Sequence, residues 1–180
     1  MIKKIKIYNR FCMDNFARTG GLNFPYTDKL WHLISIYGDG DGELLTDDTK
    51  EIFSDLGCKH FLSLNFWDIT NQVDYPSGIL FHKGQAKKVI AMIKTIQEEK
   101  EDSILVAHCQ AGISRSGAIG TFACDYCGLD YGEFLKENPY IMSNPQVLRL
   151  LRNEAGMNPT FEWHDGIDPY EPKPGEIIFR

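Results

Sequence analysis

The sequence lacks long apolar runs, because no stretch approaches the roughly 20 residues that a helix needs to span a membrane. It also lacks an excess of positive charge, since 19 Lys and Arg residues stand against 25 Asp and Glu residues, for a net charge of −6. The basic first ten residues have no apolar core of the kind found in signal peptides. We therefore expect no membrane contact and no nucleic-acid partner, unless a local basic patch changes that picture.

Cysteine is scarce and odd in number, with five residues at positions 12, 58, 109, 124 and 127. A reactive thiol must stay reduced, so we expect a reducing compartment, the cytoplasm. Cys124 and Cys127 form a C-x-x-C pair, but no second pair or histidine cluster offers the other two ligands of a zinc site. We interpret the pair as buried helix cysteines and expect neither a metal nor another cofactor.

The length and composition fit one domain. The chain has 180 residues, of which 43% are hydrophobic and 24% charged, as in ordinary globular proteins. We expect a single domain over residues 1–180, monomeric by default, in which residues 157–180 form a tail rich in proline, glycine and acidic residues.

Predicted strands alternate with predicted helices along the chain. Apolar patterns predict strands at 4–7, 33–37, 60–66 and 104–107, and helices at 9–19, 47–56, 83–100, 116–127, 131–137 and 145–155. The alternation predicts an α/β fold with a mainly parallel central sheet and helices on both faces. The strand at 104–107 is uninterruptedly apolar, which indicates a central position. The Gly/Asp run at 38–42 lacks the distant carboxylate of a calcium loop and predicts a flexible connection.

The most informative segment is 108–117, which reads His-Cys-Gln-Ala-Gly-Ile-Ser-Arg-Ser-Gly. A strand, a tight loop and a helix start gather backbone N–H groups at a positive helix end, which suits a phosphate. Arg115 can bind two phosphate oxygens with its planar fork. Cys109, as a thiolate, can attack phosphorus. The alternative is a buried cysteine beside a salt-bridged arginine.

This segment resembles the signature His-Cys-x5-Arg-Ser/Thr of the cysteine-dependent protein tyrosine phosphatases. Its Ala-Gly-x-Ser-Arg-Ser wording is similar to that of the dual-specificity branch. The resemblance implies that Cys109 is the nucleophile, that Arg115 clamps the phosphate, and that Ser116 hydrogen-bonds the sulfur and helps it leave. His108 would order the loop from behind. Backbone N–H groups would bind the phosphate oxygens, and these belong to Gln110, Ala111, Gly112, Ile113, Ser114 and Arg115.

The resemblance also implies a general acid, an aspartate that lies some thirty to forty residues before the cysteine. Asp68 and Asp74 are the candidates, at 41 and 35 residues upstream. Asp68 directly follows the strand that ends at Phe66, so we favour it, while Asp74 lies in a loop that can also turn inward. Asn144 can cap the last helix, and we do not place it in the site.

We therefore predict a phosphate monoester hydrolase of the dual-specificity type, with phosphotyrosine in proteins as substrate and phosphoserine or phosphothreonine as further ones. A cysteinyl-phosphate would be its intermediate. One alternative is a small-molecule or inositol/lipid phosphatase, which the uncharged loop residues disfavour. The other is a phosphate-binding module without turnover, which the intact Cys109, Arg115 and Ser116 disfavour.

Overall fold

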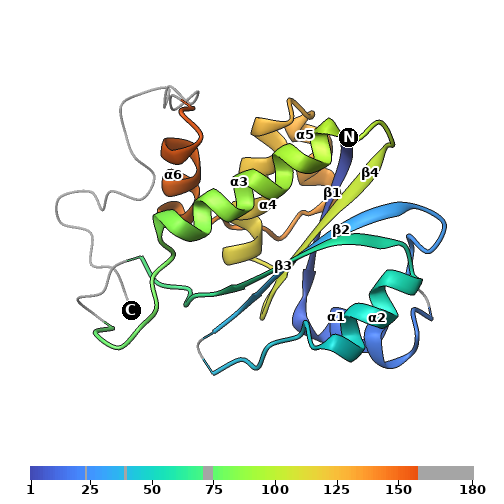
Figure 1. Ribbon diagram of the computed structural model, residues 1–180. Helices are drawn as coiled ribbons and strands as arrows, with labels where there is room; N and C mark the ends of the chain where they lie inside the picture. The colour runs from blue at the N-terminus through green and yellow to red at the C-terminus, as the bar shows by residue number, and fades with distance from the viewer. Residues whose placement is uncertain (23, 39, 71–74, 158–180) are drawn as a thin grey trace.

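The centre of the fold is a sheet of four parallel strands (Figure 1). The computed structural model describes residues 1–157 except 23, 39 and 71–74. The strands are β1 (Ile2–Asn9), β2 (Leu30–Tyr37), β3 (Cys58–Asn65) and β4 (Ser103–Cys109). Their order across the sheet is β1-β4-β2-β3, so the predicted central strand is indeed internal and β1 lies at an edge.

Helices cover both faces of this sheet, as the sequence predicted. They are α1 (Arg10–Arg18), α2 (Asp47–Asp55), α3 (Lys83–Glu98), α4 (Arg115–Tyr126), α5 (Tyr131–Glu137) and α6 (Pro145–Glu154). In Figure 1, α1 and α2 lie on one side of the strands and α3 to α6 on the other. Among the described helices, none is long and apolar enough to cross a membrane.

Two apolar cores result from the alternation of side chains along β4. Leu105 and Ala107 belong to the core under α3 to α6, whereas Ile104 and Val106 belong to the core under α1 and α2. Successive strand side chains point to opposite faces, so a strand covered on both faces must be apolar at every position. This is the physical reason for the unbroken apolar run that marked the strand in the sequence.

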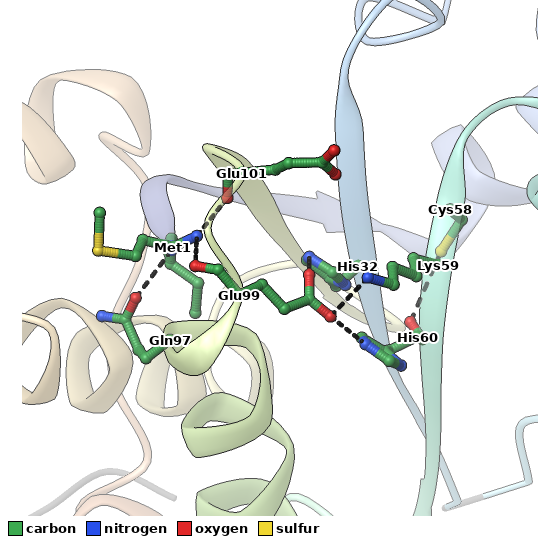
Figure 2. A network of polar contacts seen from close by, with 9 residues as sticks. Met1, His32, Cys58, Lys59, His60, Gln97, Glu99 and Glu101 are labelled. Atoms are coloured by element: carbon green, nitrogen blue, oxygen red, sulfur yellow. Dashed lines mark hydrogen bonds and ion pairs between the residues drawn. The ribbon is translucent and has the colours of Figure 1, made fainter.

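A network of polar contacts joins the segment after α3 to the starts of β1, β2 and β3, at the amino-terminal edge of the sheet (Figure 2). Glu99, which follows α3, accepts hydrogen bonds from Lys59 at 2.9 Å and pairs with His60 at 2.7 Å. Burial opposes ionisation of this carboxylate, but these two bonds outweigh it and lower its pKa to about 2. The buried ring of His32 stacks on His60, with centroids 5.1 Å apart. The amine of Met1 donates to the carbonyls of Glu99 and Glu101.

The predicted tail at 157–180 lies outside the described residues, apart from its first residue. The single-domain organisation of residues 1–180 therefore stays a prediction. Within the described part, every helix and strand expected from the sequence is present within a few residues of its expected bounds.

Candidate active site

The signature loop connects β4 to α4 at the carboxyl edge of the sheet, opposite the network of Figure 2. Cys109 ends β4 and Arg115 begins α4. Ligands of open α/β sheets bind at this edge. The fold thus brings the two residues singled out in the sequence to the two ends of one short loop.

Gly112 lets the loop pass close to the end of β1. Its φ is +70°, a left-handed conformation that favours glycine. A side chain at this position would place Cβ 2.6 Å from the backbone nitrogen of Asn9 and 2.7 Å from the carbonyl carbon of Tyr8. Backbone cannot yield as a flexible side chain would, so any other residue would push the loop away from β1.

Backbone hydrogen bonds fix the direction of the loop peptides. The carbonyl of Gln110 accepts from Arg10 N at 3.1 Å, that of Ile113 from Met142 N, and that of Ser114 from Asn144 N, the last two at 3.2 Å. Because a trans peptide holds its C=O and N–H in opposite directions, the N–H groups that follow these carbonyls point away from the three donors. These bonds hold the loop against the end of β1 and against the segment before α6.

The amino terminus of α4 has no side-chain cap. Ser114 occupies the N-cap position, but its side chain makes no capping bond and instead donates to Asp68 at 2.8 Å. The first N–H groups of a helix have no partner within the helix, and the helix dipole makes this end positive. The uncapped end is therefore available to an anion.

The Cys109 thiol is buried at the bottom of this loop and is not part of a disulfide. Its Sγ lies 3.1 Å from the hydroxyl oxygen of Ser116. A hydroxyl at this distance can donate a hydrogen bond to a thiolate, which is the contact that the resemblance implied. The catalytic roles of both residues remain predictions.

Arg115 is buried and held on one side by two oxygens. Its Nη1 donates to the carbonyl of Phe66 at 3.1 Å, and its Nη2 lies 3.3 Å from Oδ2 of Asp41. Its Nε is buried and has no hydrogen-bond partner among the described residues. A buried donor without a partner costs free energy, so this N–H is prepared for an acceptor that enters the loop.

Asp41 is a site residue that the sequence interpretation missed. The Gly/Asp run at 38–42 was expected to be a flexible connection, yet its carboxylate pairs with Arg115, and the carbonyl of Gly42 accepts a hydrogen bond from Arg10. Glycine-rich composition marked the run as a loop. No local signal showed that the loop lies against an arginine 74 positions away.

Asp68 lies beside the signature loop, and its role as general acid stays a prediction. Its Oδ1 accepts from Ser114 and from the Asn144 amide, each at 2.8 Å. Both bonds end on one oxygen, so neither of them occupies Oδ2. The competing candidate, Asp74, lies outside the described residues, and the choice between the two stays open.

Asn144 was expected to act only as a helix cap, and this was incomplete. Its side-chain oxygen does cap α6, accepting from Gln146 N at 3.0 Å and Val147 N at 3.1 Å. Its amide nitrogen meanwhile donates to Asp68. An amide has both an acceptor and donors, so one side chain fixes the start of α6 and the orientation of the predicted acid.

His108 lies behind the loop, buried between the two layers of helices. Its Nε2 is 2.8 Å from the hydroxyl of Ser35 on β2. Burial, together with the positive charges of Arg10 and Arg115, lowers its pKa to about 3. The imidazole is therefore neutral near pH 7, and its contact with Ser35 joins β4 to β2; that it orders the loop stays a prediction. In the described residues, no group of three metal-binding side chains comes together.

No protein-family model matches the sequence, and no curated protein sequence matches it either. Solved structures do. The structure of PTPMT1 in complex with PI(5)P shares 16% identity at a TM-score of 0.50, with 85% of this chain and 90% of that chain covered. Tk-PTP in its active form shares 15% identity at a TM-score of 0.51, with 86% and 92% covered. The α/β fold that the signature loop implied is thereby confirmed: the chain shares the fold of these two solved structures.

Proposed function

We propose that the protein is a phosphate monoester hydrolase that works through a cysteinyl-phosphate. The observation that carries this proposal is the buried Nε of Arg115, which has no partner among the described residues and lies in the same loop as Cys109 and the uncapped end of α4. The thiol, the guanidinium donor and the first N–H groups of α4 belong to one short segment. A phosphoryl group satisfies all three.

The reaction would proceed in two displacements. The Cys109 thiolate attacks phosphorus, the bond from phosphorus to the ester oxygen breaks, and that oxygen takes its proton from Asp68. A water molecule then attacks the cysteinyl-phosphate while the Asp68 carboxylate accepts its proton. The sulfur leaves as a thiolate that the Ser116 hydroxyl stabilises. Arg115 and the loop amides hold the equatorial oxygens throughout.

For the substrate, we propose phosphotyrosine in proteins, with phosphoserine and phosphothreonine as further candidates, and a reducing compartment such as the cytoplasm. The PTPMT1 structure contains PI(5)P, so an inositol lipid is the second candidate. Against it stands the charge around the loop. Gln110, Ala111, Ile113 and Ser114 are uncharged, and Arg115 already pairs with Asp41, so these loop side chains offer no further cation to a second phosphate.

Hydrolysis of p-nitrophenyl phosphate by the purified protein tests the reaction. We expect turnover that vanadate blocks and EDTA leaves unchanged. Cys109→Ser should abolish turnover while retaining vanadate or phosphate binding, because the loop amides and Arg115 remain. Substantial residual hydrolysis in Cys109→Ser would rule out the covalent mechanism. Normal oxyanion binding without any wild-type turnover would instead indicate a binding module.

A further inference from the structure

Half of the exposed large apolar residues in the described chain belong to, or adjoin, the segments that build the signature-loop site. Ten large apolar residues are exposed in the described chain. Five of them either lie in the loop segments that build the site or adjoin these segments, in sequence or through a backbone hydrogen bond. We call them the apolar rim, and they are Phe11 (75% exposed), Ile79 (42%), Ile113 (37%), Tyr140 (82%) and Met142 (67%). Water-exposed apolar groups grouped at one place are characteristic of a binding surface.

Backbone hydrogen bonds join the rim to the site. Met142 N donates to the carbonyl of Ile113 in the loop at 3.2 Å. The backbone N–H of Arg10, the residue before Phe11, donates to the loop carbonyl of Gln110 at 3.1 Å. The rim thus flanks the phosphate position from the end of β1 and from the segment before α6.

The segment before α6 presents its side chains in alternation. Ile141 packs on α4, within 3.2 Å of where a Cβ on Gly117 would lie, and the Ser143 hydroxyl is 2.9 Å from that of Thr121. Between and beside them, Tyr140 and Met142 face solvent. The inward residues already hold the segment in place, so the two exposed ones are not needed for packing.

Charge at the mouth selects among possible occupants. The guanidiniums of Arg10 and Arg115 are paired with Asp14 and Asp41, and Asp68 adds a further carboxylate. An anionic membrane carries many negative headgroups, which would meet these carboxylates, and the two guanidiniums named here are already paired. A polypeptide with apolar neighbours brings a single phosphate, which the loop can bind, and adds no further anion beside these carboxylates.

We propose that the apolar rim binds apolar side chains that flank a single phosphorylated residue in a polypeptide substrate. The inference rests on the proposed phosphatase function and adds a sequence preference to it. The phosphate would enter the loop, and the flanking side chains would cover Tyr140 and Met142 on one side and Phe11 on the other. Specificity would then come from apolar burial beside the site rather than from further charges.

Affinity for phosphopeptides tests this without turnover. In the Cys109→Ser background, calorimetry would compare two phosphotyrosine peptides that differ only in having leucine and valine or aspartate and glutamate beside the phosphotyrosine. We expect the apolar peptide to bind about tenfold more tightly, and Tyr140→Ser with Met142→Ser to remove most of that preference. Leu22→Ser is the matched control, because Leu22 is 65% exposed but lies after α1, away from the loop.

An unchanged preference in the Tyr140→Ser, Met142→Ser protein would overturn the inference. So would phosphatidylinositol monophosphate in phosphatidylcholine vesicles that binds more tightly than the apolar peptide and loses affinity in the same variant, because the rim would then face lipid. Failure of the proposed function is a separate result, namely no hydrolysis of p-nitrophenyl phosphate by the wild-type protein.

Discussion

Removal of the Asp41 carboxylate should weaken catalysis through Arg115. The Asp41 side chain is 13% exposed and the Arg115 side chain 5%, and Oδ2 of Asp41 lies 3.3 Å from Nη2 of Arg115. The carboxylate and the Phe66 carbonyl bind the two terminal nitrogens of the guanidinium, whereas Nε has no partner among the described residues and is the donor we propose for the phosphate. Asp41→Asn keeps the shape and an acceptor oxygen but removes the charge. Asp41→Ala removes both.

The geometry sets the size of the effect. A hydrogen bond to a charged group contributes about 1.5–3 kcal/mol. The 3.3 Å separation exceeds the roughly 2.7–2.9 Å of strong charge-assisted bonds, so the lower end applies. Since about 1.4 kcal/mol is a factor of ten in rate, Asp41→Ala should lower kcat/KM about tenfold. Asp41→Asn, which retains an acceptor, should lower it by roughly half that free energy, or about threefold.

The assay is a double-mutant cycle on kcat/KM for p-nitrophenyl phosphate, with melting temperatures measured in parallel. If Asp41 acts by positioning Arg115, then Asp41→Ala should cost little in an Arg115→Lys background, because the fork it orients is already gone. Asp47→Asn is the control, since that carboxylate is fully exposed at the start of α2. Equal tenfold losses in both backgrounds, or no loss in either, would refute the positioning role.

Three further predictions follow from the contacts of the site and the core. Arg115→Lys keeps the charge but loses the planar fork, so kcat/KM should fall by about two orders of magnitude or more, and a lysine variant that works nearly as well would make the arginine structural. Asp68→Asn should reduce hydrolysis of a phosphotyrosine peptide more than that of p-nitrophenyl phosphate, because only the poorer leaving group needs the proton. Asn144→Ala should reproduce this pattern more weakly. An Asp68→Asn variant that slows both substrates equally would exclude the acid role. Burial lowers the pKa of His32 from 6.5 to about 4, so only the unfolded chain takes up its proton between these values. The free energy of unfolding should therefore fall by up to about 1.4 kcal/mol per pH unit from pH 6.5 to 4, and in His32→Leu urea denaturation should show a shallower decline.

Much of the architecture was predictable because its signals are local. The order of strands and helices came from apolar periodicity, and the unbroken apolar run at 104–107 indicated the internal position of β4. Cys109, Arg115 and Ser116 could be singled out because they belong to one loop between a strand and a helix. Because they are close in the sequence, their proximity in the fold does not depend on contacts with distant segments.

The remaining parts of the site depend on contacts between distant segments. Arg115 meets Asp41 and the Phe66 carbonyl across 74 and 49 positions, and Asp68 meets Asn144 across 76. A glycine-rich loop and a helix cap carry the same sequence signal whether or not they face an active site. Parallel strands place all their carboxyl ends at one edge of the sheet. The strand order and the packing of α6 then decide which of the loops at that edge contact the signature loop. The sequence alone therefore indicated the signature loop, which is one continuous segment. The residues that contact Arg115 and Asp68 could be identified only from the tertiary structure, because the sheet brings them together from distant parts of the chain.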